Sequence, residues 1–240
     1  MKTLLKPAEL EGGTKAKSLF IVHSEFNDLG RIRKIFDDFG WPYKIVNPFK
    51  DGLPEEELVE YRGVVIFGGT MSVNDDLIPE IREELHFVEN VLSSGVPILG
   101  ICLGGQLISK VLGGKIEPNR EGTVEIGFWP VLPSEDGGLL FSEETHFYQW
   151  HQEGLGCPDG ATVLAHSPSF PVQAFRYRNS VALQFHPDAT QKTVRDWCNL
   201  GRHRLDQAGA QSEMIQIELA DKFEMTIDQW TRNMLRVVFS

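Results

Sequence analysis

Short apolar runs alternate with longer amphipathic stretches along the first half of the chain, from about residue 17 to residue 114. The runs are rich in β-type residues, and the stretches between them carry apolar residues at the three- and four-residue spacing of a helix. This order is expected of consecutive βαβ units, which build a parallel sheet with helices on both faces. The pattern therefore predicts an α/β fold with an open, mostly parallel sheet flanked by helices.

Glycine and proline positions help to place the elements of this half. Pro79 opens a helical pattern with Ile81, Leu85 and Val88 on one face, and Gly95 follows its end. We expect strands over residues 18–23, 43–46, 63–67 and 96–101, and helices over residues 29–39, 79–92 and 103–112.

The second half of the chain changes to short strand-like runs separated by Gly, Pro and Asn, which indicates a small antiparallel extension of the sheet. These runs cover residues 123–131, 145–150, 161–165, 172–177 and 181–185, and helices are expected over residues 190–207, 212–223 and 227–237. No linker divides the chain. We therefore expect an N-terminal extension over residues 1–16 and a single domain over residues 17–240, with a C-terminal helical appendage over residues 190–240.

Charge argues against one class of partner. Lys and Arg number 23 and Asp and Glu number 34, so the net charge of −11 repels a phosphate backbone and nucleic-acid binding is not expected. Basic clusters at residues 31–34 and 202–204 lie in helical patterns beside acidic residues, and we interpret both as solvated helix faces.

Cysteine usage and hydropathy indicate the compartment. Cys102, Cys157 and Cys198 are an odd number without C-x-x-C spacing, which disfavours both a disulfide framework and a cysteine zinc site. No apolar run approaches the roughly 18 residues of a membrane span, and the first residues lack the apolar stretch of a secretion signal. A cytoplasmic protein without membrane association is expected.

The segment GICLGGQ at residues 100–106 places Cys102 at the predicted turn from a buried strand into a helix. Flanking glycines permit a tight strand-to-helix turn that lifts the side chain out of the sheet, as in a nucleophile elbow. A helix N-terminus favours a thiolate, and its free N–H groups can face an oxyanion. The alternative interpretation is a small buried cysteine in a glycine-rich turn.

A second segment, QFHPD at residues 184–188, supports the catalytic interpretation. In extended backbone, residues two apart point the same way, so His186 and Asp188 are expected side by side. The carboxylate would hold one imidazole nitrogen while the other takes the proton of Cys102. Together the two segments predict nucleophilic catalysis by a cysteine.

These segments resemble the two signatures of class I glutamine amidotransferases. Residues 68–73, GGTMSV, resemble the family's glycine-rich oxyanion strand ending, and QWH at residues 149–151 resembles a segment that precedes the catalytic histidine. The chain is most similar to free-standing members related to the glutaminase domain of GMP synthase. The resemblance implies a flavodoxin-like α/β fold and γ-glutamyl amide hydrolysis with release of ammonia or an amine and glutamate.

By position in the family motifs, Cys102 corresponds to the nucleophile, His186 to the base and acid, and Asp188 to the orienting carboxylate. The resemblance also implies that the backbone N–H groups of Gly69 and Leu103 form the oxyanion hole. The family's usual third residue is Glu, so the shorter Asp188 predicts a longer hydrogen bond to His186.

The expected substrate contacts are Gly68, Gln106 and His151. The resemblance places Gln106 near the bound glutamyl group, with an ordinary helix-surface glutamine as the alternative. His151 meets the polar end of the substrate or else caps a turn beside a core strand. The histidines lack metal-ligand spacing and the chain has no nucleotide-phosphate loop, so neither a metal nor a cofactor is expected.

Three functions stay open at this point. The chain is an amidotransferase subunit that supplies ammonia to a synthetase on another chain, a stand-alone γ-glutamyl peptide hydrolase, or a non-catalytic relative. Its ligand in the first two cases is glutamine or a γ-glutamyl compound. Apolar residues near the C-terminus, among them Phe223, Trp230 and Leu235, either cover the sheet or bury a homodimer interface.

Overall fold

The computed structural model describes residues 16–23, 29–54, 57–75, 77–138 and 140–239, so most of the expected N-terminal extension lies outside the described residues. The strands are β1 Ser18–Ile21, β2 Tyr43–Val46, β3 Val64–Ile66, β4 Ile98–Ile101, β5 Glu117–Pro118, β6 Glu125–Pro133, β7 Thr145–His151, β8 Glu153–Gly154, β9 Thr162–His166, β10 Ala174–Tyr177 and β11 Ser180–Leu183. The helices are α1 Gly30–Phe39, α2 Pro48–Asp51, α3 Pro79–Ser94, α4 Leu103–Val111, α5 Gln191–Leu200 and α6 Glu213–Phe239, with 3-10 turns η1 Leu58–Glu60 and η2 Arg202–Arg204.

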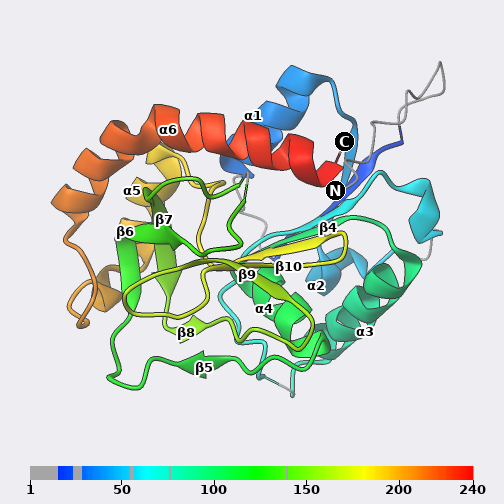
Figure 1. Ribbon diagram of the computed structural model, residues 1–240, viewed down its shortest axis with the longest axis horizontal. Helices are drawn as coiled ribbons and strands as arrows, with labels where there is room; N and C mark the ends of the chain where they lie inside the picture. The colour runs from blue at the N-terminus through cyan, green and yellow to red at the C-terminus, as the bar shows by residue number, and fades with distance from the viewer. Residues whose placement is uncertain (1–15, 24–28, 55–56, 76, 139, 240) are drawn as a thin grey trace.

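Nine strands of the described chain form one sheet with the order β2-β1-β3-β4-β11-β10-β9-β6-β7 (Figure 1). The first five are parallel to one another, with Phe20 of β1 in register with Ile45 on one side and Val65 on the other. The last four continue as antiparallel neighbours, and β5 pairs separately with β8. The predicted α/β class, with its antiparallel extension, is confirmed.

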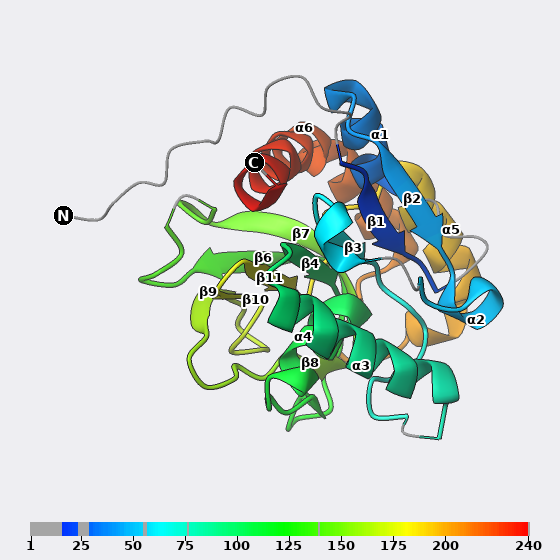
Figure 2. The same ribbon diagram turned by 90° about the vertical axis from the view of Figure 1, so that its right-hand side faces the viewer.

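Helices cover both faces of the parallel part (Figure 2). On one face, α1, α5 and α6 enclose a core that includes Ile32, Val194 and Met234. On the other, α3 and α4 pack Val88 and Leu107 against the sheet. Each of these side chains is at most 1% exposed, so the strands between the two layers are buried on both sides, as their unbroken apolar runs require.

The end of the chain differs from the prediction. The two helices expected over residues 212–223 and 227–237 are one continuous helix, α6, which begins at Glu213, because no glycine or proline separates the two amphipathic patterns. The expected helix over residues 190–207 ends at Leu200, where Gly201 and η2 follow. Helix α6 does cover the core with Leu235 and Phe239, while Met225 on its other side is 84% exposed.

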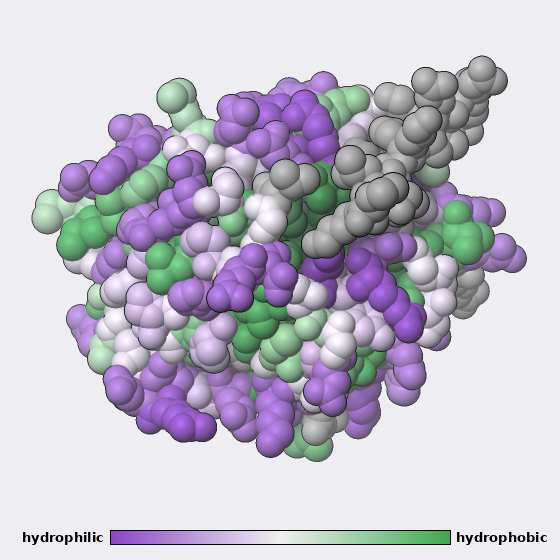
Figure 3. Space-filling view, in the orientation of Figure 1, coloured by the Kyte–Doolittle hydropathy of each residue, from purple (hydrophilic) through white to green (hydrophobic). Residues whose placement is uncertain are grey.

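The surface mixes residue types. Hydrophilic residues are interspersed with smaller hydrophobic groups over the face shown in Figure 3. Within the described residues, no helix combines the length and the apolar character that crossing a membrane demands.

Candidate active site

The candidate site lies where parallel strands end. Strands β1, β3, β4 and β11 are adjacent and parallel, so their carboxyl ends meet at one edge of the sheet. The chain reaches His23 just after β1, Gly68 after β3, Cys102 after β4 and His186 after β11. This edge is where open α/β sheets place their ligands.

Cys102 occupies the turn between β4 and α4 in a conformation that side chains rarely adopt. Its φ is 51° and its ψ is −107°, and among the described non-glycine residues only Arg178 also has a positive φ. Such a conformation costs roughly 1–3 kcal/mol and persists only where the surrounding structure holds it. The Cys102 N–H donates to the Leu183 carbonyl at 2.8 Å, which fixes the turn to β11. The side chain is thereby held at the N-terminal end of α4, 7% exposed.

The glycines of this segment are required by close packing. A Cβ on Gly104 would lie 2.2 Å from the carbonyl oxygen of Ile66, and one on Gly100 would lie 2.4 Å from the carbonyl oxygen of Gly104. The first turn of α4 therefore rests directly on the backbone of β3 and β4. Any side chain at these positions would move the turn that carries Cys102.

His186 and Asp188 meet through a turn. Strand β11 ends at Leu183, and the Ala189 N–H donates to the His186 carbonyl at 3.3 Å, so the expectation of an extended backbone through His186 and Asp188 is wrong. The turn still brings Asp188 Oδ1 to 3.3 Å from His186 Nδ1. This distance is longer than the 2.7–2.9 Å typical of charge-assisted pairs. The His186 N–H donates to the Tyr148 carbonyl, which anchors the histidine to β7.

The charge state of His186 depends on its two neighbours. Complete burial lowers the pKa of the imidazole, but the Asp188 carboxylate and the Cys102 sulfur raise it more, to about 10 from the ordinary 6.5. A Cβ on Gly68 would lie 2.7 Å from His186 Cε1 and 3.5 Å from Cys102 Cβ, so glycine leaves the imidazole its place beside the cysteine. An imidazolium at neutral pH, between a carboxylate and a sulfur, is the arrangement that follows.

We expect Asp188→Asn to lower the pKa of His186, because the substitution removes the carboxylate that raises it. Nuclear magnetic resonance of the imidazole carbons measures the midpoint directly. In the unsubstituted protein His186 should stay protonated well above pH 7 and lose its proton near pH 10. Because this pKa lies above the unfolded value, the stability that His186 contributes is complete below about pH 6.5 and is lost as the pH rises through about 10.

The exposed ring of His86 provides an internal reference in the same spectra. An unchanged His186 midpoint in Asp188→Asn would show that the carboxylate does not control this proton.

The structure brings Gly69 and Leu103 together. A Cβ on Gly69 would lie 2.6 Å from Leu103 Cδ2, so the segment that follows β3 packs closely against the first residue of α4. His23 Nδ1 lies 3.0 Å from the Gly68 carbonyl oxygen, and its Nε2 lies 2.9 Å from Glu84 Oε1. Since described peptide bonds are trans, the Gly69 N–H points away from the carbonyl that His23 holds. This peptide is therefore fixed in one orientation.

Gln106 lies next to a site residue to which sequence reasoning assigned no role. Gln106 Nε2 donates to the Glu153 carbonyl at 3.1 Å and to Gln184 Oε1 at 3.4 Å. Gln184 Nε2 in turn lies 3.7 Å from Cys102 Sγ, within donor range of the sulfur. The signal for Gln184 was its place two residues before His186 in the same segment. Both amides are buried, so this chain of side chains reaches the cysteine from inside the protein.

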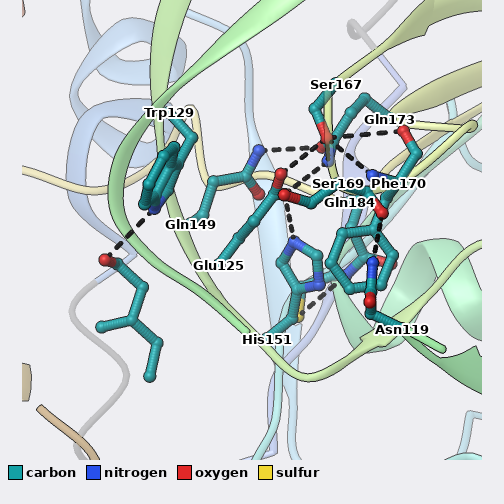
Figure 4. Close-up of polar contacts among 12 residues, drawn as sticks. Asn119, Glu125, Trp129, Gln149, His151, Ser167, Ser169, Phe170, Gln173 and Gln184 are labelled. Carbon is teal, nitrogen blue, oxygen red and sulfur yellow. Dashed lines mark hydrogen bonds and ion pairs between the residues drawn. The ribbon is translucent and has the colours of Figure 1, made fainter. Parts of the chain in front are cut away.

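His151 belongs to a buried network beside these amides (Figure 4). Its Nε2 lies 3.1 Å from Glu125 Oε2 and its Nδ1 lies 3.0 Å from the Glu153 carbonyl oxygen. Glu125 also accepts hydrogen bonds from Gln173 and Ser167. Both ring nitrogens of His151 are thus engaged by protein groups.

Arg31 fixes the segment that carries Asp188. Its side chain is buried and donates to the carbonyl oxygens of Pro187, at 3.0 Å, and Ala189. The same guanidinium pairs with Glu224 and lies 3.8 Å from Asp228, both on α6. Sequence reasoning missed this residue because its partners lie more than 150 positions away.

The interpretation of residues 31–34 and 202–204 as solvated faces is therefore wrong at one position in each cluster. Arg31 is 2% exposed and Arg204 is half-buried, whereas the remaining basic side chains of both clusters are exposed.

Comparisons with known proteins identify the family of this chain. The sequence profile of the family "Glutamine amidotransferase class-I" matches residues 31–196. The glutamine amidotransferase-like protein YfeJ of Salmonella typhimurium is 31% identical over 186 residues, which cover 73% of this chain and 77% of that protein. One subunit of the glutamine-hydrolysing GMP synthase from Methanococcus aeolicus is 31% identical, over 62% of this chain and 76% of that protein.

A crystal structure of a glutamine amidotransferase from Thermotoga maritima superimposes with a TM-score of 0.85 at 29% identity, covering 95% of this chain and all of that one. The chain spans about a quarter of the full-length GMP synthases that it matches. The family profile covers well over half of the chain, and the Salmonella relative is matched over most of both lengths. The resemblance noted in the sequence is thus confirmed, and the chain belongs to the class I glutamine amidotransferase family.

Proposed function

We propose that the protein hydrolyses a γ-glutamyl amide through a thioester on Cys102. The observation that carries this proposal is the position of the buried His186 between Asp188 and the sulfur, where its pKa is raised to about 10. An imidazolium of this kind stabilises a neighbouring thiolate and holds the proton that a leaving amine needs.

In the first half of the reaction, the Cys102 thiolate attacks the γ-carbonyl carbon. The oxyanion of the tetrahedral intermediate accepts hydrogen bonds from the N–H groups of Gly69 and Leu103. His186 gives its proton to the amide nitrogen, the C–N bond breaks, and ammonia or an amine leaves. The product on the protein is a γ-glutamyl thioester.

In the second half, His186, now neutral, takes a proton from water as the oxygen attacks the thioester carbon. The C–S bond breaks, glutamate leaves, and Cys102 is restored as the thiolate beside a protonated His186. The sum of the two halves is amide plus water giving acid plus amine. Asp188 keeps the imidazole oriented and stabilises its charge throughout.

The name of one relative supports a synthetase on another chain as the partner of this protein. The Methanococcus relative is named as one subunit of a glutamine-hydrolysing GMP synthase, so its name implies a second. In that arrangement glutamine is the substrate and ammonia passes to the partner. A purely binding role is disfavoured because Cys102, His186 and Asp188 are all retained in contact geometry.

The test is turnover of glutamine and of a panel of γ-glutamyl peptides, followed by glutamate formation and ammonia release. We expect glutamate from at least one of these substrates. A glutamine-like electrophile should label Cys102 alone, with the exposed Cys157 and the buried Cys198 as internal controls read by mass spectrometry. Absence of both glutamate and Cys102 labelling would overturn the proposal.

A further inference from the structure

Arg204 is a half-buried cation, and one of its two terminal guanidinium nitrogens has no protein partner among the described residues. Its Nη2 is shielded from solvent and has no hydrogen-bond partner among the described residues. No ion pair of Arg204 is found there either, whereas its neighbour Arg202 pairs with Glu213 at 3.3 Å. A buried guanidinium nitrogen left unpaired is costly, so such a group is expected to meet an anion when the site is filled.

A row of aromatic rings connects Arg204 with the catalytic histidine. The guanidinium carbon lies 6.0 Å from the centre of the Trp150 ring. Trp150 and Trp197 are 6.0 Å apart at 74°, and Trp197 meets the His186 ring at 4.7 Å and 88°. A Cβ on Gly201 would lie 2.4 Å from Trp150 Cζ2, so the turn before Arg204 is packed directly against this tryptophan. Arg204 is thus held in place beside the site by rigid groups.

Electrostatics supports the same placement. Burial lowers the pKa of Arg204, and the charge of Cys102 raises it in part, which places the guanidinium within electrostatic reach of the sulfur. The ordinary pKa of a guanidinium lies far above neutrality, so Arg204 is a cation at neutral pH.

The side of the site on which Arg204 lies decides what it can bind. In the reaction proposed above, His186 protonates the departing nitrogen, so the leaving amine lies next to the imidazole. Trp197 and Trp150 pack between that imidazole and Arg204, and the guanidinium interacts electrostatically with Cys102. The positive charge of Arg204 therefore favours a carboxylate carried by the leaving amine, whereas ammonia carries no such group.

We infer that Arg204 binds a carboxylate on the leaving half of the substrate, so that the preferred substrates are γ-glutamyl amino acids or peptides with a free carboxyl end. This inference rests on the proposed function and extends it, because it favours a stand-alone hydrolase over supply of ammonia from glutamine. Arg204 also lies beyond residues 31–196, the part that the family profile matches, so this contact belongs to the C-terminal part of the chain.

The experiment compares three substrates: γ-glutamylglycine, its C-terminal amide γ-glutamylglycinamide, and glutamine. We expect the unsubstituted protein to prefer the free acid over its amide by about 100-fold in kcat/KM. Arg204→Gln should remove this preference by lowering turnover of the acid alone, and Arg204→Lys should keep part of it because the charge remains. The exposed Arg202→Gln serves as the matched control and should behave like the unsubstituted protein.

The outcomes separate the two proposals. Turnover without an acid preference would overturn the role of Arg204 and leave the hydrolysis proposal standing. An equal loss on all three substrates in Arg204→Gln would also overturn it, since that pattern belongs to a structural residue. If the unsubstituted protein turns over none of the three substrates, the role of Arg204 is overturned, and the hydrolysis proposal falls with it when Cys102 labelling is also absent.

Discussion

Replacing Cys102 with alanine is expected to lower γ-glutamyl turnover by about 10⁵-fold, as removal of a nucleophile does in related mechanisms. Without the sulfur no thioester forms, and neither Cys157 nor Cys198 stands beside an imidazole among the described residues. Initial rates of glutamate formation measure the effect. Cys157→Ala is the control and should keep full activity.

Stability separates the loss of chemistry from loss of fold in this variant. Alanine keeps a Cβ at φ 51°, so the strain of the turn remains and thermal unfolding should change little. The Cys102→Gly variant should be as inactive as the alanine variant. Its free energy of unfolding should be higher than that of the alanine variant by about 0.5–1 kcal/mol, because glycine adopts this φ without strain. Residual activity near that of the unsubstituted protein in either variant would contradict the assignment of the nucleophile.

His186→Gln should lower turnover by about 10⁴-fold or more, because one side chain serves as the acid, the base and the partner of the thiolate. Glutamine retains polarity and much of the volume in a buried position that is 3% exposed. The rate of glutamate formation is again the measurement. His86→Gln on the exposed face of α3 is the matched control.

The double variant Cys102→Ala/His186→Gln gives a sharper criterion. When two residues act in the same step, removing either one already abolishes their shared contribution to the rate. The double variant should therefore be no slower than the Cys102→Ala variant alone. Losses that multiply would indicate that His186 acts independently of the cysteine.

The parallel half of the fold was accessible from the sequence because its signals are local. The glycine after each helix, and Pro79 at the start of α3, report requirements of the backbone at their own positions. The GICLGGQ segment is also a local signal. Its glycines are needed because a Cβ at these positions would clash with the backbone of neighbouring elements. A pattern that depends on near neighbours predicts both the element and its place.

The remaining features depend on distant partners or on an exact backbone path. The turn that carries Asp188 is an exception, because Pro187 at the second position of the turn that Ala189 closes onto His186 is a local signal that the prediction of an extended strand end overlooked. The burial of Arg31 and Arg204 was hard to predict. Arg31 donates to carbonyl groups and Arg204 packs on a tryptophan, and both contacts exist only in the folded chain. Helix α6 is one helix of 27 residues where two were expected, because no glycine or proline separates the two amphipathic patterns.

The double engagement of Arg31 has a consequence for the order of events when the chain is made. This side chain, from the start of the molecule, reaches the carbonyls around Asp188 and is itself paired with Glu224 near the end. The turn of Asp188 is therefore held on both sides only after α6 has docked. While α6 is still inside the ribosomal exit tunnel, the turn at Cys102 can form, but Arg31 lacks its ion pair with Glu224. It follows that the site is complete only after α6 has been synthesised and has packed against Arg31.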